Sequence, residues 1–514
     1  MKNIILLGAS NSLVHNGLQK GLKDGIEKLL GGGGLEFHNL ALGGCDGLQK
    51  LYELIHPKNQ ELFKNAEAVI IETNVNEYDI SGLAGLCFQR LAANFELLCK
   101  ALANLDTKVI FLILPLEPRG NTAKIVKIIE NFNRKKIKQY HFNCIDMQKY
   151  YNEKGINPFF VTTDIFHQLS SLMRIVGEKI IANLHHFKKH PKTHFKMPNF
   201  LIKSPQELFD KNLPCKELQN SLLNEKIYKL DEKDVLKFKN SYSGYGILGI
   251  YICNFFEVKP YNIASFILKN TKQKIIKGVA SHSYHLHTLE QIFTIDEESF
   301  LYFNQDNEAI SEGSLWIHKN KGCIWLNNAP ILNNISHIGL SHFFLVKLDE
   351  NFCKKDIDLQ SLESEENIDI PYDFTHILPP FELYKEIIEE YCQRMDVVKQ
   401  KALQDKITQL QKAMIRHYLA YKLGSCMIRN SKSLLGCIKM PFLLITLTIA
   451  HKERPKFQLP KLVCDEALEE KQSVAYKLGE AFIKASKTWY KGGYFKFCFK
   501  DVPRLKKEFK TSHS

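Results

Sequence analysis

The first 190 residues alternate short apolar runs with helix-length segments, and this alternation limits the fold more than any other feature of the sequence. Five runs are rich in β-branched and other apolar residues: residues 4–8, 35–42, 68–73, 108–116 and 142–147. The segments between them carry apolar residues three or four positions apart, as in amphipathic helices. We therefore expect an α/β domain with a parallel five-stranded sheet covered by helices on both faces.

Small and polar residues follow the ends of these runs. Ser10 follows the first run, the glycines of ALGGCDG follow the second, and Asn74 and Asn76 follow the third. Asp164 and His167 stand three positions apart before the last helix. Ligands bind beyond the carboxyl ends of parallel strands. A hydroxyl nucleophile needs a base, an acceptor that orients the base, and donors for the oxyanion, and these residues offer a candidate for each.

The stretch GASNS, residues 8–12, leaves an alternative open. Ser10, Asn11 and Ser12 are all good helix N-caps, so the local sequence does not choose between a nucleophile and a cap. The segments at the later strand ends favour Ser10 as the nucleophile and leave Asn11 and Ser12 as caps. Read alone, Asn76 is also compatible with a simple turn, and residues 164–167 with a capped helix start.

In this order, the four segments resemble the sequence blocks of the SGNH, or GDSL, superfamily of serine esterases and acyltransferases. Residues 8–10 (GAS) are similar to its GDS block, and residues 39–44 (NLALGG) to its N-x-G-x-x-G block. Residues 74–77 (NVNE) are similar to G-x-N-D, and residues 164–167 (DIFH) to D-x-x-H. Ala9 stands where the family usually has aspartate. The resemblance covers about residues 1–184.

The resemblance implies a three-layer α/β/α fold and a role for each matched residue. Ser10 is the expected nucleophile, His167 its base, and Asp164 the residue that orients the base. The backbone N–H groups of Ser10 and Gly44 and the side-chain amide of Asn76 are the expected oxyanion hole, with Asn74 a weaker candidate for that amide. The resemblance implies no cofactor and no metal.

The rest of the chain divides into a β-rich region and a helical region. Between residues 199 and 360, short runs rich in Ile, Phe, Tyr and Val predict a β-rich, sandwich-like domain. Trp316 and Trp325 in this region are compatible with sugar stacking or with a hydrophobic core. A helical pattern fills residues 378–514, where AYKLG occurs at residues 420 and 475 as part of a repeat 55 residues apart. We therefore expect domains at residues 1–190, 199–360 and 378–514.

The C-terminal region is basic, since residues 471–514 contain eleven lysines and arginines against three acidic residues. Together with its aromatic residues, this charge suits an anionic membrane surface, and we expect no nucleic acid partner. The apolar run at residues 440–450 is too short to span a bilayer and fits either a membrane interface or a core. The region also resembles a C-terminal module of epsilonproteobacterial sugar transferases that build surface polysaccharides. This implies a polysaccharide or lipid-linked glycan as substrate.

Three other features argue against metal, phosphate-loop and disulfide chemistry. Residues 31–34 (GGGG) lack the Lys-Ser/Thr of a phosphate loop, and His282, His285 and His287 lack cysteine or carboxylate partners for a metal. The histidines of residues 185–194 lie among lysines, which indicates a solvated linker. Thirteen cysteines without a CxxC pair favour free thiols in a reducing cytoplasm.

The sequence therefore predicts an SGNH-type serine enzyme that transfers or hydrolyses an ester-linked group on sugar hydroxyls of a surface polysaccharide. Its expected location is the cytoplasm, at the inner face of the cytoplasmic membrane. Three alternatives remain: a carbohydrate O-acyl esterase, an O-methyl phosphoramidate transferase, and a non-catalytic glycan-binding or assembly protein.

Overall fold

The chain forms two compact units, Met1–Glu389 and Glu390–Ser514, and each is described here by itself. The computed structural model describes residues 1–30, 34–118, 122–156, 166–220, 223–256, 262–280, 284–323, 333–348, 357–452 and 465–511. Asp164, His282, Trp325 and residues 31–33 of the glycine run lie outside these ranges.

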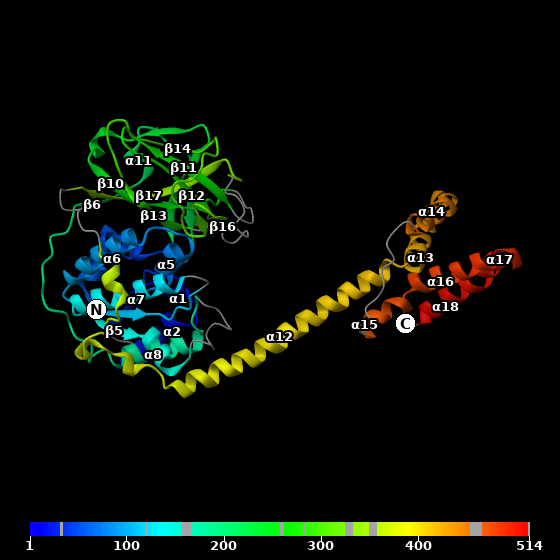
Figure 1. The fold of residues 1–514 in the computed structure, drawn as a ribbon, viewed down its shortest axis with the longest axis horizontal. Helices are drawn as coiled ribbons and strands as arrows, with labels where there is room; N and C mark the ends of the chain where they lie inside the picture. The colour runs from blue at the N-terminus through cyan, green and yellow to red at the C-terminus, as the bar shows by residue number, and fades with distance from the viewer. Residues whose placement is uncertain are drawn as a thin grey trace. The chain divides into compact units, whose positions relative to one another are not determined.

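The first unit contains the chain's blue N-terminal end in Figure 1 and begins with a five-stranded parallel sheet. The order of its strands is β2-β1-β3-β4-β5. Its strands are β1 (Lys2–Leu7), β2 (Leu35–Asn39), β3 (Ala66–Thr73), β4 (Lys108–Ile113) and β5 (Asn143–Asp146). The four residues of β1 from position 4 to position 7 are fully buried, because helices cover both faces of the sheet. The fold class predicted for this part, a three-layer α/β/α arrangement with a parallel five-stranded sheet, is confirmed.

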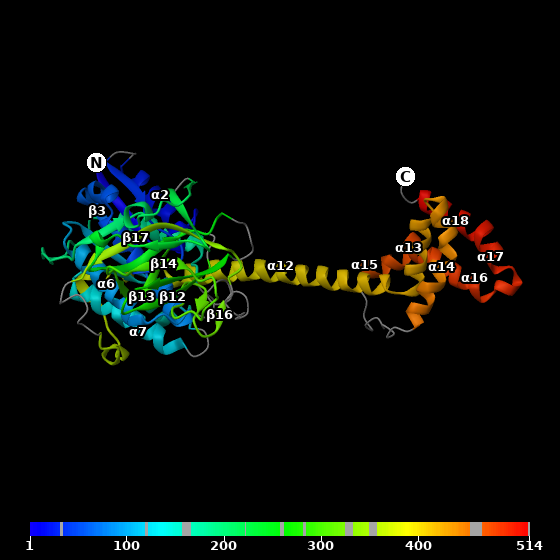
Figure 2. The ribbon, with the colours of Figure 1, turned by 90° about the horizontal axis from the view of Figure 1, so that it is seen from above.

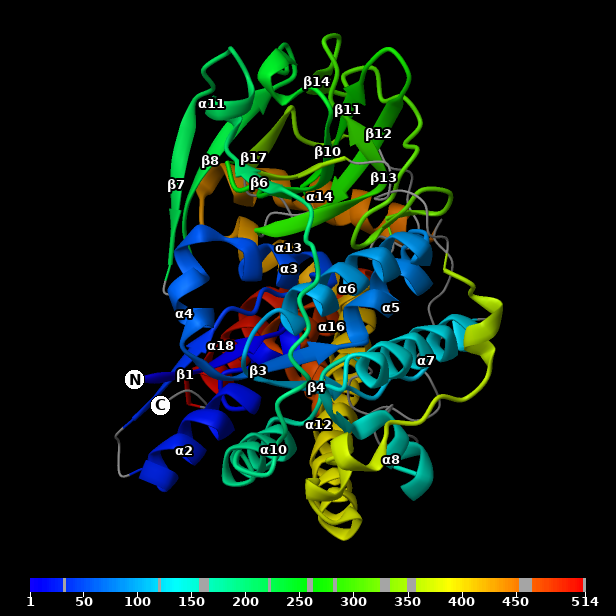
Figure 3. The ribbon, with the colours of Figure 1, turned by 90° about the vertical axis from the view of Figure 1, so that its left-hand side faces the viewer.

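Helices α2 (Leu18–Leu30) and α10 (Ser170–Ala182) pack together on one face of this sheet (Figure 3). The other face is covered by α3 (Gly47–Ile55), α6 (Phe88–Ala103) and α7 (Ala123–Gln139). The short helices α1 (Ser10–Leu13) and α5 (Val75–Tyr78) follow β1 and β3, so the sheet presents both at the carboxyl ends of its strands.

A β-sandwich follows, as predicted, and it lies on the α3 side of the α/β domain (Figure 3). One sheet has the order β13-β10-β17-β8-β7, with β6 also paired to β17, and the other has the order β12-β11-β14-β9. Fully buried Leu236, Ile250, Phe266 and Phe343 belong to the core between the sheets. The strands are β6 (Phe200–Lys203), β7 (Cys215–Gln219), β8 (Asn224–Asp231), β9 (Val235–Lys237), β10 (Tyr245–Ile252), β11 (Ile263–Lys269), β12 (Lys274–Ala280), β13 (His285–Thr294), β14 (Phe300–Phe303) and β17 (His337–Lys347).

The chain then returns to the α/β domain and runs along it. Ile357 exchanges two hydrogen bonds with the side chain of Gln89, at 2.6 and 2.9 Å. The N–H of Phe374 donates to the carbonyl of Cys144 in β5 at 2.8 Å, and Tyr150 donates to the carbonyl of Pro379 at 3.0 Å. These bonds attach residues 357–379 to the edge of the sheet.

The segment expected to be a solvated linker is partly buried. His185, His186 and His194 are exposed, but His190 is 7% exposed and its ring meets Phe142 edge-on at 5.3 Å. The linker prediction is therefore wrong for His190, because the segment packs beside β5 instead of crossing open solvent.

The second unit is helical, as predicted, and the internal repeat forms a helix pair in it (Figure 2). Its main helices are α13 (Leu419–Asn430), α14 (Leu434–Lys452), α16 (Val474–Lys487) and α18 (Val502–Thr511), while α12 (Phe381–Arg416) crosses the boundary between the units. A Cβ on Gly424 of α13 would overlap the carbonyl oxygen of Ala475 in α16, and one on Gly479 would overlap that of Ala420. The two copies of AYKLG thus use the same alanine and glycine positions to bring two helix backbones together.

Candidate active site

The turn after β1 presents Ser10 at the start of helix α1. Ser10 is partly exposed, whereas Ala9, Asn11 and Ser12 are buried. In the described part of the chain, no group forms a hydrogen bond with the Ser10 hydroxyl. A hydroxyl that no protein group engages at the carboxyl edge of a parallel sheet is available to a ligand.

A carboxylate from β3 holds this turn. One oxygen of Glu72 accepts from the N–H of Ala9 at 2.8 Å, from the N–H of Ser12 at 2.9 Å and from the Ser12 hydroxyl at 2.6 Å. Its other oxygen accepts from the side-chain amide of Asn11 at 3.2 Å. Position 9 is alanine in this chain, so the carboxylate that orders the turn comes from residue 72.

The side chain of Asn11 connects the Ser10 turn to the backbone beside His167. Its amide nitrogen donates to the carbonyl of Phe166 at 2.9 Å, and its oxygen accepts from the N–H of Gln168 at 2.8 Å. The residues on both sides of His167 are thereby fixed to the residue after Ser10. The structure thus brings the Ser10 and His167 segments together, while Asp164 lies outside the described residues.

Asn11 and Ser12 do not cap helix α1, which corrects the prediction made for them. The N-cap residue of α1 is Ala9, without a side-chain hydrogen bond to the helix. Both polar side chains reach residues far along the chain instead, Ser12 reaching Glu72 and Asn11 reaching Glu72, Phe166 and Gln168. The local sequence could not distinguish these long-range bonds from capping.

The second predicted segment forms a tight turn at Gly44. Gly44 has φ of 69°, a left-handed conformation that favours glycine, and a Cβ here would lie 2.5 Å from the side chain of Leu315. Among the described residues, no acceptor meets the backbone N–H of Gly44 or of Ser10. Both N–H groups are therefore available for a ligand oxygen.

The two asparagines after β3 differ in their surroundings. Asn74 is fully buried, and its amide donates to the carbonyl of Leu114 at 3.1 Å. Its φ of 93° is strained for a residue other than glycine, and its N–H donates to Glu77 at 3.0 Å. Asn76 is 6% exposed, and no described residue accepts a hydrogen bond from its amide. Among the described residues, the side-chain amide of Asn76 is therefore available to donate to a ligand, whereas that of Asn74 already donates to Leu114.

Buried charges lie below the Gly44 turn. Asp46 caps α3 by accepting from the N–H of Leu48 at 2.9 Å, and Lys50 on the same helix is 1% exposed. Burial raises the pKa of Asp46, and it also raises the pKa of Glu77, which the nearby Lys50 ammonium lowers in part. Asp46 thereby fixes the start of α3 immediately after the predicted oxyanion turn.

The β-sandwich touches this turn directly. His285 of β13 donates from Nδ1 to the carbonyl oxygen of Gly43 at 2.8 Å, and Thr288 donates to Asp46 at 2.8 Å. The His285 ring meets Trp316 edge-on at 5.6 Å. These contacts could not be predicted from the sequence, because neither residue belongs to a motif that indicates which domain surface it meets. Over the described residues, no cluster of histidine, cysteine and acidic residues could hold a metal ion.

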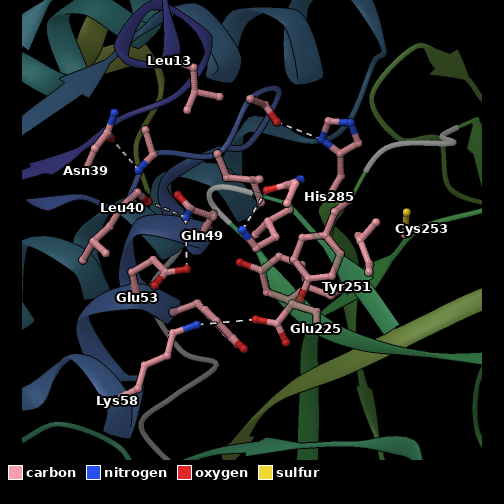
Figure 4. A pocket seen from close by; sticks show the side chains of 18 residues that line it. Leu13, Asn39, Leu40, Gln49, Glu53, Lys58, Glu225, Tyr251, Cys253 and His285 are labelled. Carbon is pink, nitrogen blue, oxygen red and sulfur yellow. Dashed lines mark hydrogen bonds and ion pairs between the residues drawn. The ribbon is translucent and has the colours of Figure 1, made fainter. Parts of the chain in front are cut away.

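A cavity of about 550 Å³ lies between the two domains of the first unit (Figure 4). Figure 4 shows Asn39, Gln49, Glu53 and Lys58 of the α/β domain opposite Glu225, Tyr251 and His285 of the sandwich. The cavity reaches Leu13 at the end of α1 and Gly43 beside the oxyanion turn, so its wall includes neighbours of Ser10 and Gly44.

Known proteins resemble separate parts of the chain. A family described as a domain of unknown function (DUF8374) matches residues 347–511. No curated protein matches the sequence. The similarity to sugar transferases inferred from the C-terminal sequence therefore has no support among these matches.

Similar solved structures include esterases and lipases. An acetyl xylan esterase, AlAXEase, and the lipase Lip_vut3 from a goat rumen metagenome are each 20% identical, with TM-scores of 0.28. Each covers 35% of this chain, and the matches span 98% and 97% of their own chains. A lipase/acylhydrolase from Enterococcus faecalis is 16% identical, with a TM-score of 0.28, over 37% of this chain and 98% of its own. These identities are too low to carry an activity over to this chain.

Proposed function

We propose that this protein is a serine enzyme of the SGNH type that acts on an ester-linked group carried by a sugar hydroxyl. The observation that carries the proposal is the pair of hydrogen bonds from Asn11 to the backbone on either side of His167. This pair fixes the residue after the candidate nucleophile to the segment of the candidate base. The free N–H groups of Ser10 and Gly44 and the free amide of Asn76 support an oxyanion hole.

In this mechanism, the Ser10 hydroxyl attacks the ester carbonyl carbon and His167 takes its proton, while Asp164 orients the imidazole. Three donors hold the tetrahedral oxyanion: the N–H groups of Ser10 and Gly44 and the amide of Asn76. Collapse of the intermediate releases the alcohol, which receives the proton from His167. A second hydroxyl, from water or from a sugar, then attacks the acyl-enzyme carbonyl carbon while His167 takes its proton. The bond to the Ser10 oxygen breaks, and His167 returns the proton to that oxygen, which regenerates the free enzyme.

The test uses a fluorophosphonate probe, which reacts with activated serines. Wild-type protein is expected to be labelled at Ser10, and Ser10→Ala is expected to lose the label. Ser243→Ala, which changes an exposed serine of the sandwich, serves as the matched control and is expected to keep it. Asn76→Ala should slow labelling by about a hundredfold or more. A wild-type protein without label would instead favour the non-catalytic glycan-binding alternative.

Transfer is preferred over hydrolysis because the sandwich closes one side of the site and adds a cavity beside it. A second hydroxyl substrate needs such a place, whereas water does not. Incubation of an acetylated sugar with wild-type protein, with and without a second sugar, separates the two reactions. An acetylated second sugar is the expected product, while free acetate alone in both incubations would identify an esterase. Capsular glycan and the phosphoramidate group remain candidates for the natural acceptor and the transferred group.

We also propose that helix α14 docks the second unit on an anionic membrane surface. Among the described helices, α14 alone is long and apolar enough to cross a bilayer by length and composition. Five of its exposed apolar residues recur every three or four positions and are 54 to 84% exposed: Leu434, Ile438, Phe442, Ile445 and Ile449. Leu435 and Leu443 beside them are exposed as well. Met440, Leu444 and Leu447 pack on the core of the unit. A helix held on one side by protein suits the interface plane better than a span.

The charges of α14 and its neighbours fit this surface. The helix contains Lys439 and Lys452 and no acidic residue, and elsewhere the same unit exposes Trp489, Tyr490 and Phe495. Aromatic and basic residues of this kind favour the headgroup region of an anionic bilayer. The apolar run, which fitted either interface or core by sequence, is thus largely exposed within its own unit.

Vesicle sedimentation tests the membrane proposal. Wild-type protein is expected to bind vesicles that contain phosphatidylglycerol and to bind pure phosphatidylcholine less. Phe442→Asp should weaken binding more than about tenfold, since it removes a large apolar side chain from the interface. Ile370→Asp, at a residue 90% exposed on the first unit, is the matched control and should bind normally. Equal binding by Phe442→Asp and wild type would contradict the proposal. It would also be contradicted if the wild type is a dimer in solution and Phe442→Asp is a monomer, because the apolar face would then bind a second copy of the chain.

A further inference from the structure

The cavity between the α/β domain and the sandwich is built from both domains. Gln49, Tyr52 and Glu53 of α3 form one wall, and Glu225 of β8 and Tyr251 of β10 form the other (Figure 4). Tyr52 and Tyr251 meet edge-on at 4.7 Å across the domain boundary. The pocket therefore exists only while the sandwich packs on α3, and its shape is fixed by that interface.

The polar groups that line the cavity are suited to ligands that carry hydroxyl groups. Glu53 accepts from the amide of Asn59 at 2.7 Å, and Glu225 lies 3.5 Å from the Lys58 ammonium. The carboxylates retain further lone pairs, because each carboxylate can accept several hydrogen bonds. Carboxylate oxygens are strong acceptors for the hydroxyl groups of a polyol.

Two buried polar atoms of the pocket lining, one from each wall, have no partner in the described structure. They are the hydroxyl of Tyr251 and the amide oxygen of Gln49. An unpaired buried polar group destabilises a fold, so such atoms call for an unseen partner. Both belong to lining residues, and a hydroxyl-bearing ligand could provide the missing bonds.

The aromatic residues of the pocket add flat apolar surface. The rings of Tyr251 and Tyr284 are stacked, with centroids 4.7 Å apart and planes at 14°. Leu40 and Leu223 line the pocket as well. A pocket that combines aromatic faces with a few convergent acceptors is suited to a sugar ring, which has apolar C–H faces and a rim of hydroxyls.

We infer that this pocket is a saccharide subsite that binds a neutral sugar unit next to the Ser10 centre. The inference rests on the proposed function, since it names the place of the sugar that carries or receives the ester. The pocket lining contains two carboxyl groups, those of Glu53 and Glu225, and one ammonium group, that of Lys58, which lies 3.5 Å from Glu225. Burial raises the pKa of Glu53, and the Lys58 ammonium is already paired with Glu225, so the described lining offers no unpaired ammonium to an anionic sugar and favours a neutral one. The pocket thus selects by charge as well as by shape.

The position of the pocket explains how it would serve the reaction. Gly43 lines it, and Gly43 precedes the Gly44 turn and accepts the bond from His285. Leu13 lines it too, at the end of the helix that Ser10 begins. Binding energy from a sugar held at this distance can orient the reacting bond at Ser10.

The test measures sugar binding by saturation-transfer NMR with full-length protein and three probes: methyl β-D-glucopyranoside, methyl β-D-galactopyranoside and methyl β-D-glucuronide. We expect wild type to bind at least one neutral glycoside at millimolar concentration and to bind the glucuronide more weakly. Tyr251→Phe removes only the unpaired hydroxyl and should weaken binding about fivefold or more. Leu223→Trp should block the pocket from the sandwich side.

The matched control is Tyr384→Phe. It removes another buried hydroxyl that has no partner among the described residues, and Tyr384 does not line this pocket. It should bind sugar like wild type. The inference is overturned if no neutral glycoside binds, if Tyr251→Phe binds like wild type, or if the glucuronide binds best. Fluorophosphonate labelling of the wild-type protein, with Ser10→Ala as its control, separates this inference from the proposed function. If the wild type binds sugar but is not labelled, the subsite is retained and the proposed enzyme activity is wrong. If the wild type is labelled but binds no sugar, the proposed activity is retained and the subsite is wrong.

Discussion

Glu72→Gln tests the idea that a carboxylate from β3 orders the nucleophile turn. The glutamine oxygen can take the place of the Glu72 oxygen that accepts three hydrogen bonds, from the N–H of Ala9 and from the N–H and hydroxyl of Ser12. Its NH₂ group then faces the amide nitrogen of Asn11, where the carboxylate had accepted a bond at 3.2 Å. Donor thus faces donor at this position.

Asn11 cannot relieve this clash by rotating its amide. Rotation would give up the bond to the carbonyl of Phe166 at 2.9 Å and the bond from the N–H of Gln168 at 2.8 Å. Three bonds weaken by roughly 1 kcal/mol each when their acceptor loses its charge, and the lost bond adds roughly 1 to 2 kcal/mol. We therefore expect Glu72→Gln to lower the free energy of unfolding by roughly 4 to 5 kcal/mol.

Two measurements check this prediction. Urea unfolding gives the loss of stability, and hydrogen exchange of residues 8–13 reports whether the turn itself loosens. Fluorophosphonate labelling of the folded fraction should also slow, because Asn11 connects the turn to the His167 segment. The control is Glu67→Gln on the same strand, which removes an ion pair with Lys108 at 2.7 Å and should cost below about 1 kcal/mol. If Glu72→Gln matches Glu67→Gln in stability, exchange and labelling, the reasoning is refuted.

Three further predictions concern the rest of the chain. Burial raises the pKa of Glu130 to about 7, although Arg134 opposes the shift, so the folded protein holds this proton more tightly than the unfolded chain. The contribution of Glu130 to the free energy of unfolding should therefore be highest below pH 4.5 and fall by up to roughly 3 kcal/mol as the pH rises from 4.5 through 7. Glu130→Gln should reduce the difference between the urea midpoints measured at pH 5 and pH 8. Gly424→Ala and Gly479→Ala should each lower the stability of the second unit by about 1 to 3 kcal/mol, measured by urea unfolding, because a Cβ at either position would overlap a backbone carbonyl oxygen of the facing helix. Asp46→Asn should leave thermal stability nearly unchanged, because an amide can still bond Leu48 and Thr288, whereas Asp46→Ala loses both bonds and should cost about 2 kcal/mol.

The sheet could be predicted from the sequence because its strands are buried on both faces. Residues 4–7 and 109–113 are fully buried, so each strand had to be a continuous apolar run, and such runs are visible without any knowledge of neighbours. The positions of Ser10 and Asn76 followed from the same pattern, since each comes directly after a strand. The sandwich strands were recognisable for a related reason, namely their short apolar runs between turns.

The bonds that shape the candidate site were not predictable, because they join residues distant in the sequence. Asn11 reads as a helix cap, but its partners Phe166 and Gln168 lie more than 150 positions away. Glu72 did carry a signal, an acidic residue near the end of an otherwise apolar strand, but nothing in the sequence says which turn it meets. His285 could not be placed at all, since its contact with Gly43 depends on how the sandwich packs on α3.

The exposed face of α14 shows a different limit of the sequence. An apolar run of this length has the same composition whether it fills a core or faces outward, so only the packing of its neighbours decides. Leu444 is buried and Phe442 is exposed two positions earlier on the same helix. The choice between core and surface therefore depends on α13 and α16, which occupy one side of the helix and leave the other uncovered.

The carboxylate of Glu72, in a chain that has alanine at position 9, bears on whether the candidate site is catalytic or non-catalytic. A buried carboxylate is costly unless its oxygens are paired, and an unused site would lose such a residue without loss of function. Glu72 is 2% exposed and accepts four hydrogen bonds, three of them from the residues that flank Ser10 closely and one from the residue that reaches the His167 segment. A single acidic side chain thus orders the candidate nucleophile and, through Asn11, the candidate base. Glu72 is therefore the positioning residue on which the proposed chemistry depends most.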